Sequence, residues 1–259
     1  MDCDNIQEII VVTGTDYHGS SSEYRSKMRK IYVWDIHGNL KPGWPKDISS
    51  QNNRPPSIGD LDGDGDLEIV IFSRLKNDNY DDGFVYGWHH DGLLFDGWPK
   101  QFPKFAVGVP PMIADLENDN DPEIIVSKVA LAKGIYLYDN NGNILQNWPR
   151  MIQGHFYGAV GNLDQDSEKE FVTTGVNSGD VGVISCFNKD GSILPGWPLN
   201  DTRFNLPDGQ PVIGDLDKDG INEIIFPTMN YKVNVLNYEG DFLPNWPKTL
   251  VYILSLIHI

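Results

Sequence analysis

A Trp-Pro pair that recurs at nearly constant spacing limits the possible folds of this chain more than any other feature. Successive pairs are separated by 54, 50, 49 and 49 residues. Six residues before each Trp stands a Gly that follows Asp, Asn, Glu or His, which is the turn chemistry of a β-hairpin. A period of about 50 residues predicts a repeat protein in which each repeat is one supersecondary unit. The pairs begin at Trp44, Trp98, Trp148, Trp197 and Trp246, and the glycines are Gly38, Gly92, Gly142, Gly191 and Gly240.

A nine-residue acidic stretch recurs in the same register. It covers residues 60–68 (DLDGDGDLE), 115–123 (DLENDNDPE), 162–170 (NLDQDSEKE) and 215–223 (DLDKDGINE). Each stretch runs into a short apolar segment rich in β-branched residues, which is typical of a buried strand. Further short strands precede the hairpin Gly, the Trp-Pro pair and the next acidic stretch. Four short strands per repeat predict an all-β fold, a β-propeller built from four-stranded blades.

The repeat boundaries follow from this register. We predict about five repeats, at residues 1–53, 54–105, 106–152, 153–205 and 206–253. Because Glu8 aligns with Glu68, the chain starts inside an acidic stretch, and we expect it to be part of a larger propeller. Residues 254–259 break the pattern and match the translation of a library-preparation adaptor, so we expect a non-native tail. A native terminal strand is the alternative.

The charge balance excludes several classes of function. The 259 residues contain 37 Asp plus Glu against 20 Lys plus Arg, a formal net charge of -17. Without a basic cluster, such a chain is not expected to bind nucleic acid. No apolar run is long enough to cross a bilayer, so membrane insertion is not expected either. The 2 cysteines provide no disulfide scaffold.

The acidic stretches have the composition of calcium loops. Oxygen ligands at alternating positions, with Gly where the chain turns, suit a hard and flexible cation. In residues 60–68 the side chains of positions one, three, five and nine and the carbonyl of position seven would bind. An EF-hand is excluded because position twelve holds Ile71, Val126, Thr173 and Phe226 instead of Glu. The candidate ligands are Asp60, Asp62, Asp64, Asp66 and Glu68; Asp115, Glu117, Asp119, Asp121 and Glu123; Asn162, Asp164, Asp166, Glu168 and Glu170; Asp215, Asp217, Asp219, Ile221 and Glu223; and, in an incomplete first loop, Asp2, Asp4 and Glu8.

The loops differ in expected affinity. The two loops that start at Asp60 and Asp215 keep Asp at positions one, three and five and Gly at position six, so they should bind most tightly. Glu117 and Asn162 depart from this pattern and should weaken their loops. The loops hold 21 of the 37 acidic residues, a density that would be strongly repulsive without a cation. The alternative is a set of solvated acidic turns.

Together, the acidic loop, the following apolar strand and the hairpin before Trp-Pro resemble FG-GAP (VCBS-type) repeats, the calcium-loop blades of integrin-α-like β-propellers. Residues 156–164 (FYGAVGNLD) and 210–217 (QPVIGDLD) match the first strand of that repeat best. The resemblance extends from residue 2 to about residue 250. It implies calcium ligands at loop positions one, three, five, seven and nine. Such propellers commonly have seven or eight blades, so it also implies that this chain is a fragment of one.

Length variation predicts where a ligand would bind. The connection between the strand after the acidic loop and the strand before the hairpin Gly varies most, and it is longest at residues 14–30. Variable loops on one face of a repeat array usually carry binding specificity, so we expect a protein or carbohydrate ligand there. Tyr17, His18, Tyr24 and Arg25 are the candidate contacts in the longest connection. We expect the Trp-Pro tryptophans to pack between repeats, with a carbohydrate platform as the alternative.

No catalytic motif is recognisable. GxSxG, P-loop and GxGxxG patterns and a Cys/His pairing are absent from the sequence. His89 and His90 lack an HExxH or Cys partner, which argues against a metal role for them. We therefore predict a non-catalytic, calcium-binding extracellular module for adhesion or for protein or carbohydrate binding, within a longer multidomain chain. The alternative is a fragment of a calcium-dependent secreted enzyme such as a polysaccharide lyase.

Overall fold

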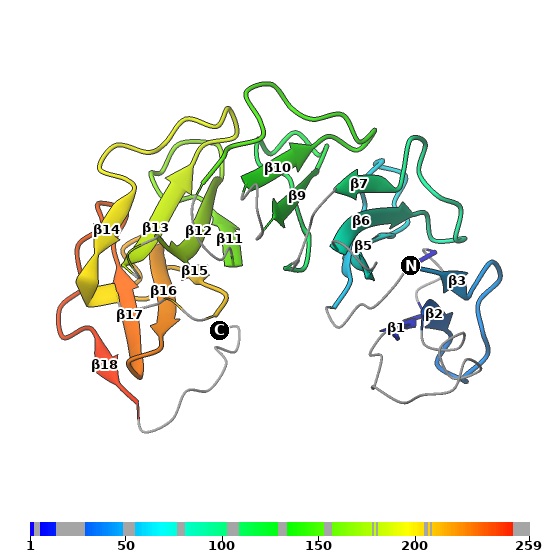
Figure 1. Ribbon diagram of the computed structural model, residues 1–259, viewed down its shortest axis with the longest axis horizontal. Helices are drawn as coiled ribbons and strands as arrows, with labels where there is room; N and C mark the ends of the chain where they lie inside the picture. The colour runs from blue at the N-terminus through cyan, green and yellow to red at the C-terminus, as the bar shows by residue number, and fades with distance from the viewer. Residues whose placement is uncertain are drawn as a thin grey trace. The chain divides into compact units, whose positions relative to one another are not determined.

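The computed structural model of residues 1–259 is organised as a series of small antiparallel sheets (Figure 1). Contacts divide the chain into two compact units, the first made of Met1–Ala114 and Asp121–Leu145 and the second of Asp115–Asn120 and Gln146–Ile259. The structure describes residues 1–2, 6–13, 29–48, 55–76, 81–102, 109–128, 134–152, 157–177, 179, 181–204, 207 and 209–250.

The first unit contains three of the sheets. The first sheet comprises β1 (Ile9–Val12), β2 (Lys30–Trp34) and β3 (Lys46–Asp47). The second comprises β4 (Ser57–Gly59), β5 (Glu68–Lys76), β6 (Asp81–Trp88) and β7 (Lys100–Phe102). The third comprises β8 (Met112–Ala114), β9 (Glu123–Lys128) and β10 (Gly134–Tyr138).

The second unit contains the other two sheets. The fourth comprises β11 (Tyr157–Gly161), β12 (Glu170–Val176), β13 (Gly182–Phe187) and β14 (Leu199–Asp201), followed by the 3-10 helix η1 (Thr202–Phe204). The fifth comprises β15 (Val212–Gly214), β16 (Glu223–Thr228), β17 (Lys232–Leu236) and β18 (Lys248–Thr249). In the part of the chain that is described, no helix is long and apolar enough to span a membrane.

Each sheet is an antiparallel meander in which the strands lie side by side in chain order. Chain-order antiparallel strands are the topology of a propeller blade, as the sequence predicted. The second, fourth and fifth sheets have the four predicted strands, whereas the first and third have three among the described residues. In the third, the residues that follow Leu145 belong to the second unit.

The predicted hairpin turns are confirmed. The N–H of Gly38, Gly92, Gly142, Gly191 and Gly240 in each case donates to the carbonyl three residues earlier. All five glycines have φ between 73° and 86°, the left-handed region that glycine adopts without steric cost. Bridges two residues after the Gly, such as Trp88 with Leu94 and Phe187 with Ile193, close the turns.

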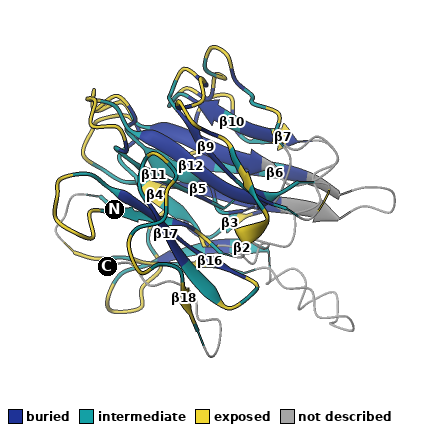
Figure 2. Cartoon of the chain, turned by 90° about the vertical axis from the view of Figure 1, so that its left-hand side faces the viewer, coloured by how far each residue is buried: buried dark blue, intermediate teal, exposed yellow. Residues whose placement is uncertain are grey.

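Buried residues follow the central strands of the sheets (Figure 2). In β5 the residues Ile69, Val70 and Ile71 have no exposed surface, and β16 is buried throughout. Successive sheets of one unit approach each other closely at a small residue. A Cβ added to Gly59 would lie 2.8 Å from Ile113, and one added to Gly161 would lie 2.6 Å from Ile213. Glycine therefore admits the isoleucine of the following sheet.

Three of the Trp-Pro tryptophans form a hydrogen bond to the hairpin of the next repeat, in line with the predicted packing between repeats. The indole N–H of Trp44 donates to the carbonyl of His90 at 3.0 Å, and that of Trp197 donates to Tyr238 at 2.9 Å. Trp148 makes the same bond to Lys189, at 2.6 Å. Each acceptor lies two residues before the hairpin Gly of the next repeat. The Trp98 ring lies 5.9 Å from that of Tyr138, and all five Trp-Pro bonds are cis.

Candidate metal centres

Four acidic loops occupy the same place in their sheets. Residues 60–68 join β4 to β5, and residues 115–123 join β8 to β9. Residues 162–170 and 215–223 make the corresponding connections from β11 to β12 and from β15 to β16. In each loop the glutamate at position nine is the first residue of the second strand. The loops are therefore anchored at both ends by paired strands.

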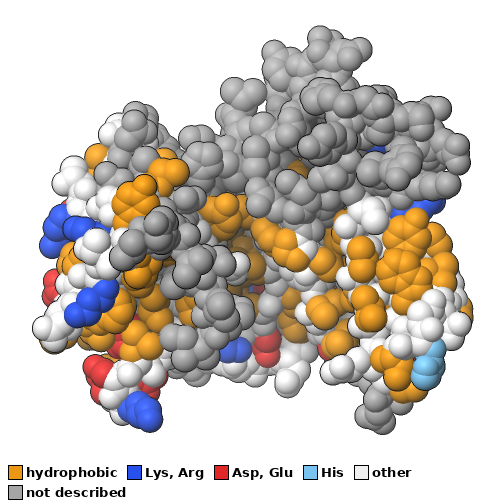
Figure 3. Space-filling model, turned by 90° about the horizontal axis from the view of Figure 1, so that it is seen from below, with side chains coloured by type: hydrophobic (Ala, Val, Ile, Leu, Met, Phe, Trp, Pro, Cys, Tyr) orange, Lys and Arg blue, Asp and Glu red, His pale blue; other side chains and the backbone are white. Residues whose placement is uncertain are grey.

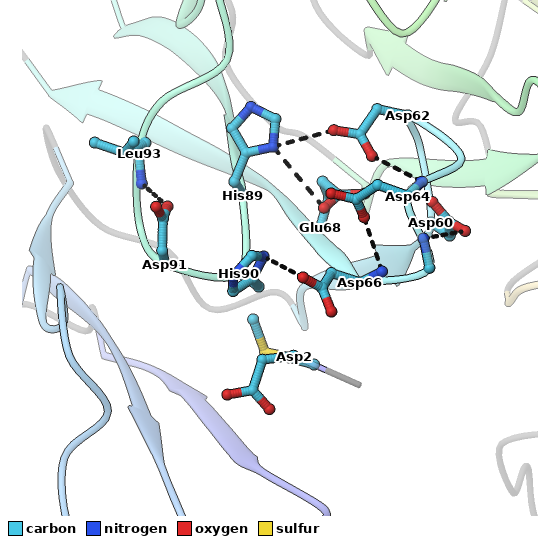
Figure 4. Close-up of polar contacts among 12 residues, drawn as sticks. Asp2, Asp60, Asp62, Asp64, Asp66, Glu68, His89, His90, Asp91 and Leu93 are labelled. Atoms are coloured by element: carbon cyan, nitrogen blue, oxygen red, sulfur yellow. Dashed lines mark hydrogen bonds and ion pairs between the residues drawn. The ribbon is translucent and has the colours of Figure 1, made fainter. Parts of the chain in front are cut away.

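Residues 60–68 curl around their own carboxylates. Asp60 accepts hydrogen bonds from the N–H groups of Gly63 at 2.8 Å and Gly65 at 3.2 Å. Both glycines have left-handed φ values, 73° and 92°, as the sequence predicted. The curl places one oxygen each of Asp60, Asp62 and Asp64 within 4.8 Å of one another (Figure 4). Three carboxylate oxygens at that separation can surround a single cation.

Glu68 is buried beneath these aspartates. Its side chain is fully buried, and Oε2 accepts the N–H of Leu61 at 2.7 Å. Among the described residues, no hydrogen-bond donor reaches Oε1. Burial, with a further contribution from the neighbouring aspartates, raises the pKa of Glu68 to about 7. A buried carboxylate oxygen without a donor, next to other carboxylates, has the environment of an oxygen that binds a cation.

The fourth loop has a similar arrangement. Glu170 is fully buried, its Oε2 accepts the N–H of Leu163 at 2.5 Å, and its Oε1 has no hydrogen-bond donor. Burial raises the pKa of Glu170 to about 7. Its carboxylate lies within 4.8 Å of oxygens of Asp164 and Asp166. Asn162 accepts the N–H of Gln165 at 2.8 Å and also donates to the carbonyl of Asp166.

The fifth loop also gathers three carboxylates. Oxygens of Asp215, Asp217 and Glu223 lie within 4.8 Å of one another. Oε2 of Glu223 accepts the N–H of Leu216 at 2.8 Å, and burial raises the pKa of Glu223. Asp215 accepts the N–H groups of Lys218 at 2.6 Å and of Gly220 at 3.1 Å. The predicted position-seven residues Ile221 and Glu168 donate their N–H groups to Asp219 and Asp166, at 2.8 and 2.7 Å.

The third loop satisfies its charges differently. Glu117 forms an ion pair with Lys189 at 2.6 Å, so a lysine meets the carboxylate at position three. Asp115 accepts the N–H groups of Asp119 and Asn120, each at 3.0 Å. These bonds outweigh the effect of partial burial and hold the pKa of Asp115 below its usual value. In the described residues, no group of three metal-ligating side chains within 4.8 Å includes a residue of this loop, Asp121 and Glu123 among them.

A lysine also meets the incomplete first loop. Lys41 Nζ lies 2.6 Å from Asp2 Oδ2 and 3.3 Å from Glu8 Oε1. Lys41 stands three residues after its hairpin Gly, where the other repeats have Phe95, Leu145, Leu194 and Leu243. Asp4, the remaining candidate ligand here, lies outside the described residues. In the first loop the ammonium group of Lys41 therefore lies beside the carboxylates of Asp2 and Glu8.

Sequence reasoning missed two features of the sites. In three of the four complete loops the residue at position four has a left-handed φ although it is not glycine: Asn118, Gln165 and Lys218. His89 was given no metal role, yet its Nδ1 lies within 4.8 Å of oxygens of Asp62 and Glu68. Its neighbour His90 faces the position-seven residue Asp66, with 3.1 Å between Nδ1 and Oδ2. The available signal was the register, because the other hairpins carry Asp or Asn where His89 stands.

Comparison with known proteins agrees with this architecture. Residues 60–126, which include the second and third acidic loops, match the FG-GAP-like repeat family. No curated protein matches the chain.

Solved β-propellers resemble this chain in fold. The structure of the Dos1 propeller aligns with a TM-score of 0.56 and 12% identity, covering 86% of this chain and 54% of Dos1. BBS1N in complex with ARL6DN aligns with a TM-score of 0.53 and 13% identity, covering 96% of this chain and 63% of BBS1N. The chain thus spans about half of the former and less than two thirds of the latter. The fold is that of a β-propeller.

Proposed function

We propose that this chain is a calcium-stabilised β-propeller module that binds a protein partner without catalysis. The observation that carries the proposal is the repeated gathering of three carboxylate oxygens within 4.8 Å in the second, fourth and fifth loops. In the second and fourth loops the buried Glu also has an oxygen that no donor satisfies. A bound cation would satisfy that oxygen and offset the repulsion between carboxylates.

The donor set favours calcium among the divalent cations. The fourth and fifth clusters offer carboxylate oxygens only. Calcium accepts six to eight oxygen ligands in flexible geometry, whereas magnesium demands a near-ideal octahedron. The fourth loop would bind through Asp164, Asp166 and Glu170, and the fifth through Asp215, Asp217 and Glu223. Bound calcium would neutralise each loop and fix the connection between two strands.

We expect these loops to bind calcium as weakly as extracellular calcium modules do. Extracellular calcium modules bind with dissociation constants of about 10⁻⁴–10⁻³ M, which suits millimolar surroundings. Such weak sites would stay empty at the much lower calcium concentration inside cells. We therefore propose an extracellular location for the module. Calcium would then bind during folding and add to the stability of the folded state.

A protein partner is better supported than a carbohydrate. BBS1N, which shares the fold, was solved in complex with ARL6DN. The tryptophans considered as a carbohydrate platform are withdrawn from the surface, because Trp44 and Trp98 are only 5% and 7% exposed. Exposed apolar side chains include Ile9 and Ile36 of the first repeat, and Figure 3 shows hydrophobic side chains at the surface. The enzyme alternative would be favoured if His18, Arg25 and Lys27 converged with an acidic residue of another repeat, and these three lie outside the described residues.

Thermal unfolding of the full chain tests the calcium sites. The melting temperature is measured after EDTA treatment and again in 2 mM calcium, for the wild type and for Asp215→Asn/Asp217→Asn. At a dissociation constant of about 0.2 mM, each site adds about 1.4 kcal/mol, or about 3–5 °C. The variant should lose one such increment. Asp190→Asn removes a hairpin carboxylate outside the loops and should leave the increment unchanged. Equal melting temperatures with EDTA and calcium in the wild type would contradict the proposal.

A further inference from the structure

His89 differs from the residue at the same position of every other hairpin. Three residues before the hairpin Gly, the other repeats have Asp35, Asp139, Asn188 and Asn237. Asp35, for example, accepts the N–H groups of His37 and Asn39, each at 2.8 Å. In the second sheet the side chain of Asp91 accepts the N–H of Leu93 at 2.8 Å. The imidazole of His89 is therefore not needed to cap its own turn.

The imidazole instead faces the acidic loop of its own sheet. Nδ1 of His89 lies 3.4 Å from Asp62 Oδ2 and 3.9 Å from Glu68 Oε1 (Figure 4). The ring packs edge to face on Phe95, with 4.7 Å between centroids. The backbone N–H of His89 donates to the carbonyl of Leu93 at 2.9 Å. Backbone and ring are thus both held in place, with Nδ1 towards the carboxylates.

On Glu68, the oxygen near Nδ1 of His89 is Oε1, which has no hydrogen-bond partner among the described residues. Glu68 has no exposed surface, and its Oε1 accepts no hydrogen bond. A cation bound at this oxygen would satisfy it, and this observation is separate from the number of acidic residues nearby. Glu170 in the fourth loop has the same unsatisfied oxygen. There the corresponding hairpin residue is Asn188, so the nitrogen donor is particular to the second sheet.

We propose that the second loop is a transition-metal site of the zinc class, with Nδ1 of His89, Oδ2 of Asp62 and Oε1 of Glu68 as ligands. Imidazole nitrogen is a good ligand for zinc and related ions and a poor one for calcium. Zinc binds nitrogen and carboxylate oxygen at about 2.0–2.2 Å, so two of its ligands are at most about 4.4 Å apart. The distances of 3.4 and 3.9 Å from Nδ1 to the two oxygens meet that limit.

The chain would then carry two kinds of metal site. In the fourth and fifth sheets Asn188 and Asn237 stand at the position of His89, and the loops of those sheets have oxygen-only clusters. The second loop combines two carboxylates with one nitrogen and leaves a further coordination position for water. This proposal does not require calcium to bind at the other loops. If His89 only forms an ion pair with Asp62 and Glu68, its replacement will leave the zinc affinity unchanged.

Metal titration of the full chain tests the site. After removal of metals with EDTA and dialysis, zinc binding is measured by calorimetry and cobalt binding by visible absorption. We expect one tight zinc site and a cobalt spectrum of low coordination number with a nitrogen ligand. His89→Asn, which installs the residue found at 188 and 237, should weaken zinc binding at least tenfold and abolish the cobalt bands. Zinc should also shift the imidazole nitrogen resonance of His89 in the wild type.

Control variants separate this site from other outcomes. His90→Asn removes the neighbouring imidazole, which faces Asp66, and should keep zinc affinity within about twofold of the wild type. Circular dichroism checks that both variants fold. Equal zinc affinity in the wild type and in His89→Asn, or no tight zinc binding at all, would overturn the proposal. The calcium-dependent increment of the fifth loop is measured separately, so failure of calcium binding does not count against the zinc site.

Discussion

The first and second acidic loops occupy equivalent positions but meet their negative charge in different ways. In the first, Lys41 reaches from the hairpin and pairs with Asp2 and Glu8. In the second, the equivalent hairpin residue is Phe95, which packs on His89 and leaves Glu68 Oε1 without a donor. The lysine in the hairpin thus gives the first loop a cation from the chain itself, beside the N-terminal ammonium that also pairs with Glu8.

The largest expected effect is a pH dependence that calcium suppresses. In the metal-free chain the pKa values of Glu68 and Glu170 are raised to about 7 by burial. The folded state therefore binds more protons than the unfolded state between the ordinary Glu pKa and 7. Stability is fully present at about pH 4 and falls as pH rises to about 7, by roughly 1–3 kcal/mol per glutamate.

Urea unfolding in EDTA at pH 4.5, 6 and 7.5 measures this dependence. In millimolar calcium the slope should flatten, because the metal takes the place of the proton, and calcium binding at pH 6 should release protons. Stability in EDTA that rises between pH 5 and 7 would contradict the assignment of these carboxyls. The fourth loop is the main test, because its sheet has Asn188 where the second sheet has His89.

A second prediction is that the change in stability caused by one substitution has opposite signs with and without calcium. Glu170→Gln keeps an acceptor for the N–H of Leu163 but removes the charge. Without calcium, loss of a buried charge should leave stability unchanged or raise it by about 1 kcal/mol. With calcium, loss of a ligand should lower stability by about 1–2 kcal/mol. Paired melting curves in EDTA and calcium measure the reversal. A stability change of the same sign in EDTA and in calcium would contradict a role of the Glu170 carboxylate in binding a cation.

Lys41→Leu extends the comparison to the first loop. The variant installs the residue found at positions 194 and 243 and removes the ammonium from Asp2 and Glu8. Since the ion pair is partly buried, we expect a loss of about 1 kcal/mol in EDTA. Calcium should restore part of that loss. Differential scanning calorimetry measures both values, and Lys46→Leu provides a matched control lysine in the same sheet. A loss that calcium leaves unchanged would mean that the first loop cannot accept a metal.

The smallest expected effect is at the third loop. Lys189→Met should free Glu117, whose side chain is 42% exposed, at a cost of about 0.5 kcal/mol or less. The freed carboxylate could then join Asp115 and Asp119, so calcium binding measured by equilibrium dialysis should rise towards one additional ion per chain. Lys218→Met, within the fifth loop, is the control. Unchanged stoichiometry would mean that Lys189 is not what keeps calcium away.

The features that repeat were predictable from the sequence, and the features that differ between repeats were not. The hairpin glycines, the packing of the Trp-Pro tryptophans and the position of the acidic loops each recur with fixed spacing. Local turn chemistry and the period determine them. Whether the predicted residues bind calcium stays a prediction, as do the repeat boundaries, the blade number and the extracellular location.

The unpredicted contacts join residues that are far apart in the sequence. Lys189 meets Glu117, and Lys41 meets Asp2, because neighbouring strands and sheets bring them together laterally. Composition reports that lysines exist but not which carboxylate each one reaches. His89 was missed for the same reason, since metal-binding motifs with fixed spacing do not include a histidine that approaches a loop from the next hairpin. Comparing equivalent positions between repeats would have singled out both Lys41 and His89.

The bond from a tryptophan indole to the following hairpin also has an evolutionary consequence. Trp44, Trp148 and Trp197 all find their acceptor at the same position of the next repeat. Because the acceptor is a main-chain carbonyl, the bond does not depend on which side chain stands at that position of the next repeat. Duplication or loss of one whole repeat therefore leaves the remaining junctions complete, whereas a change of half a repeat leaves an indole without its acceptor. Such a gene can lengthen or shorten in steps of one period.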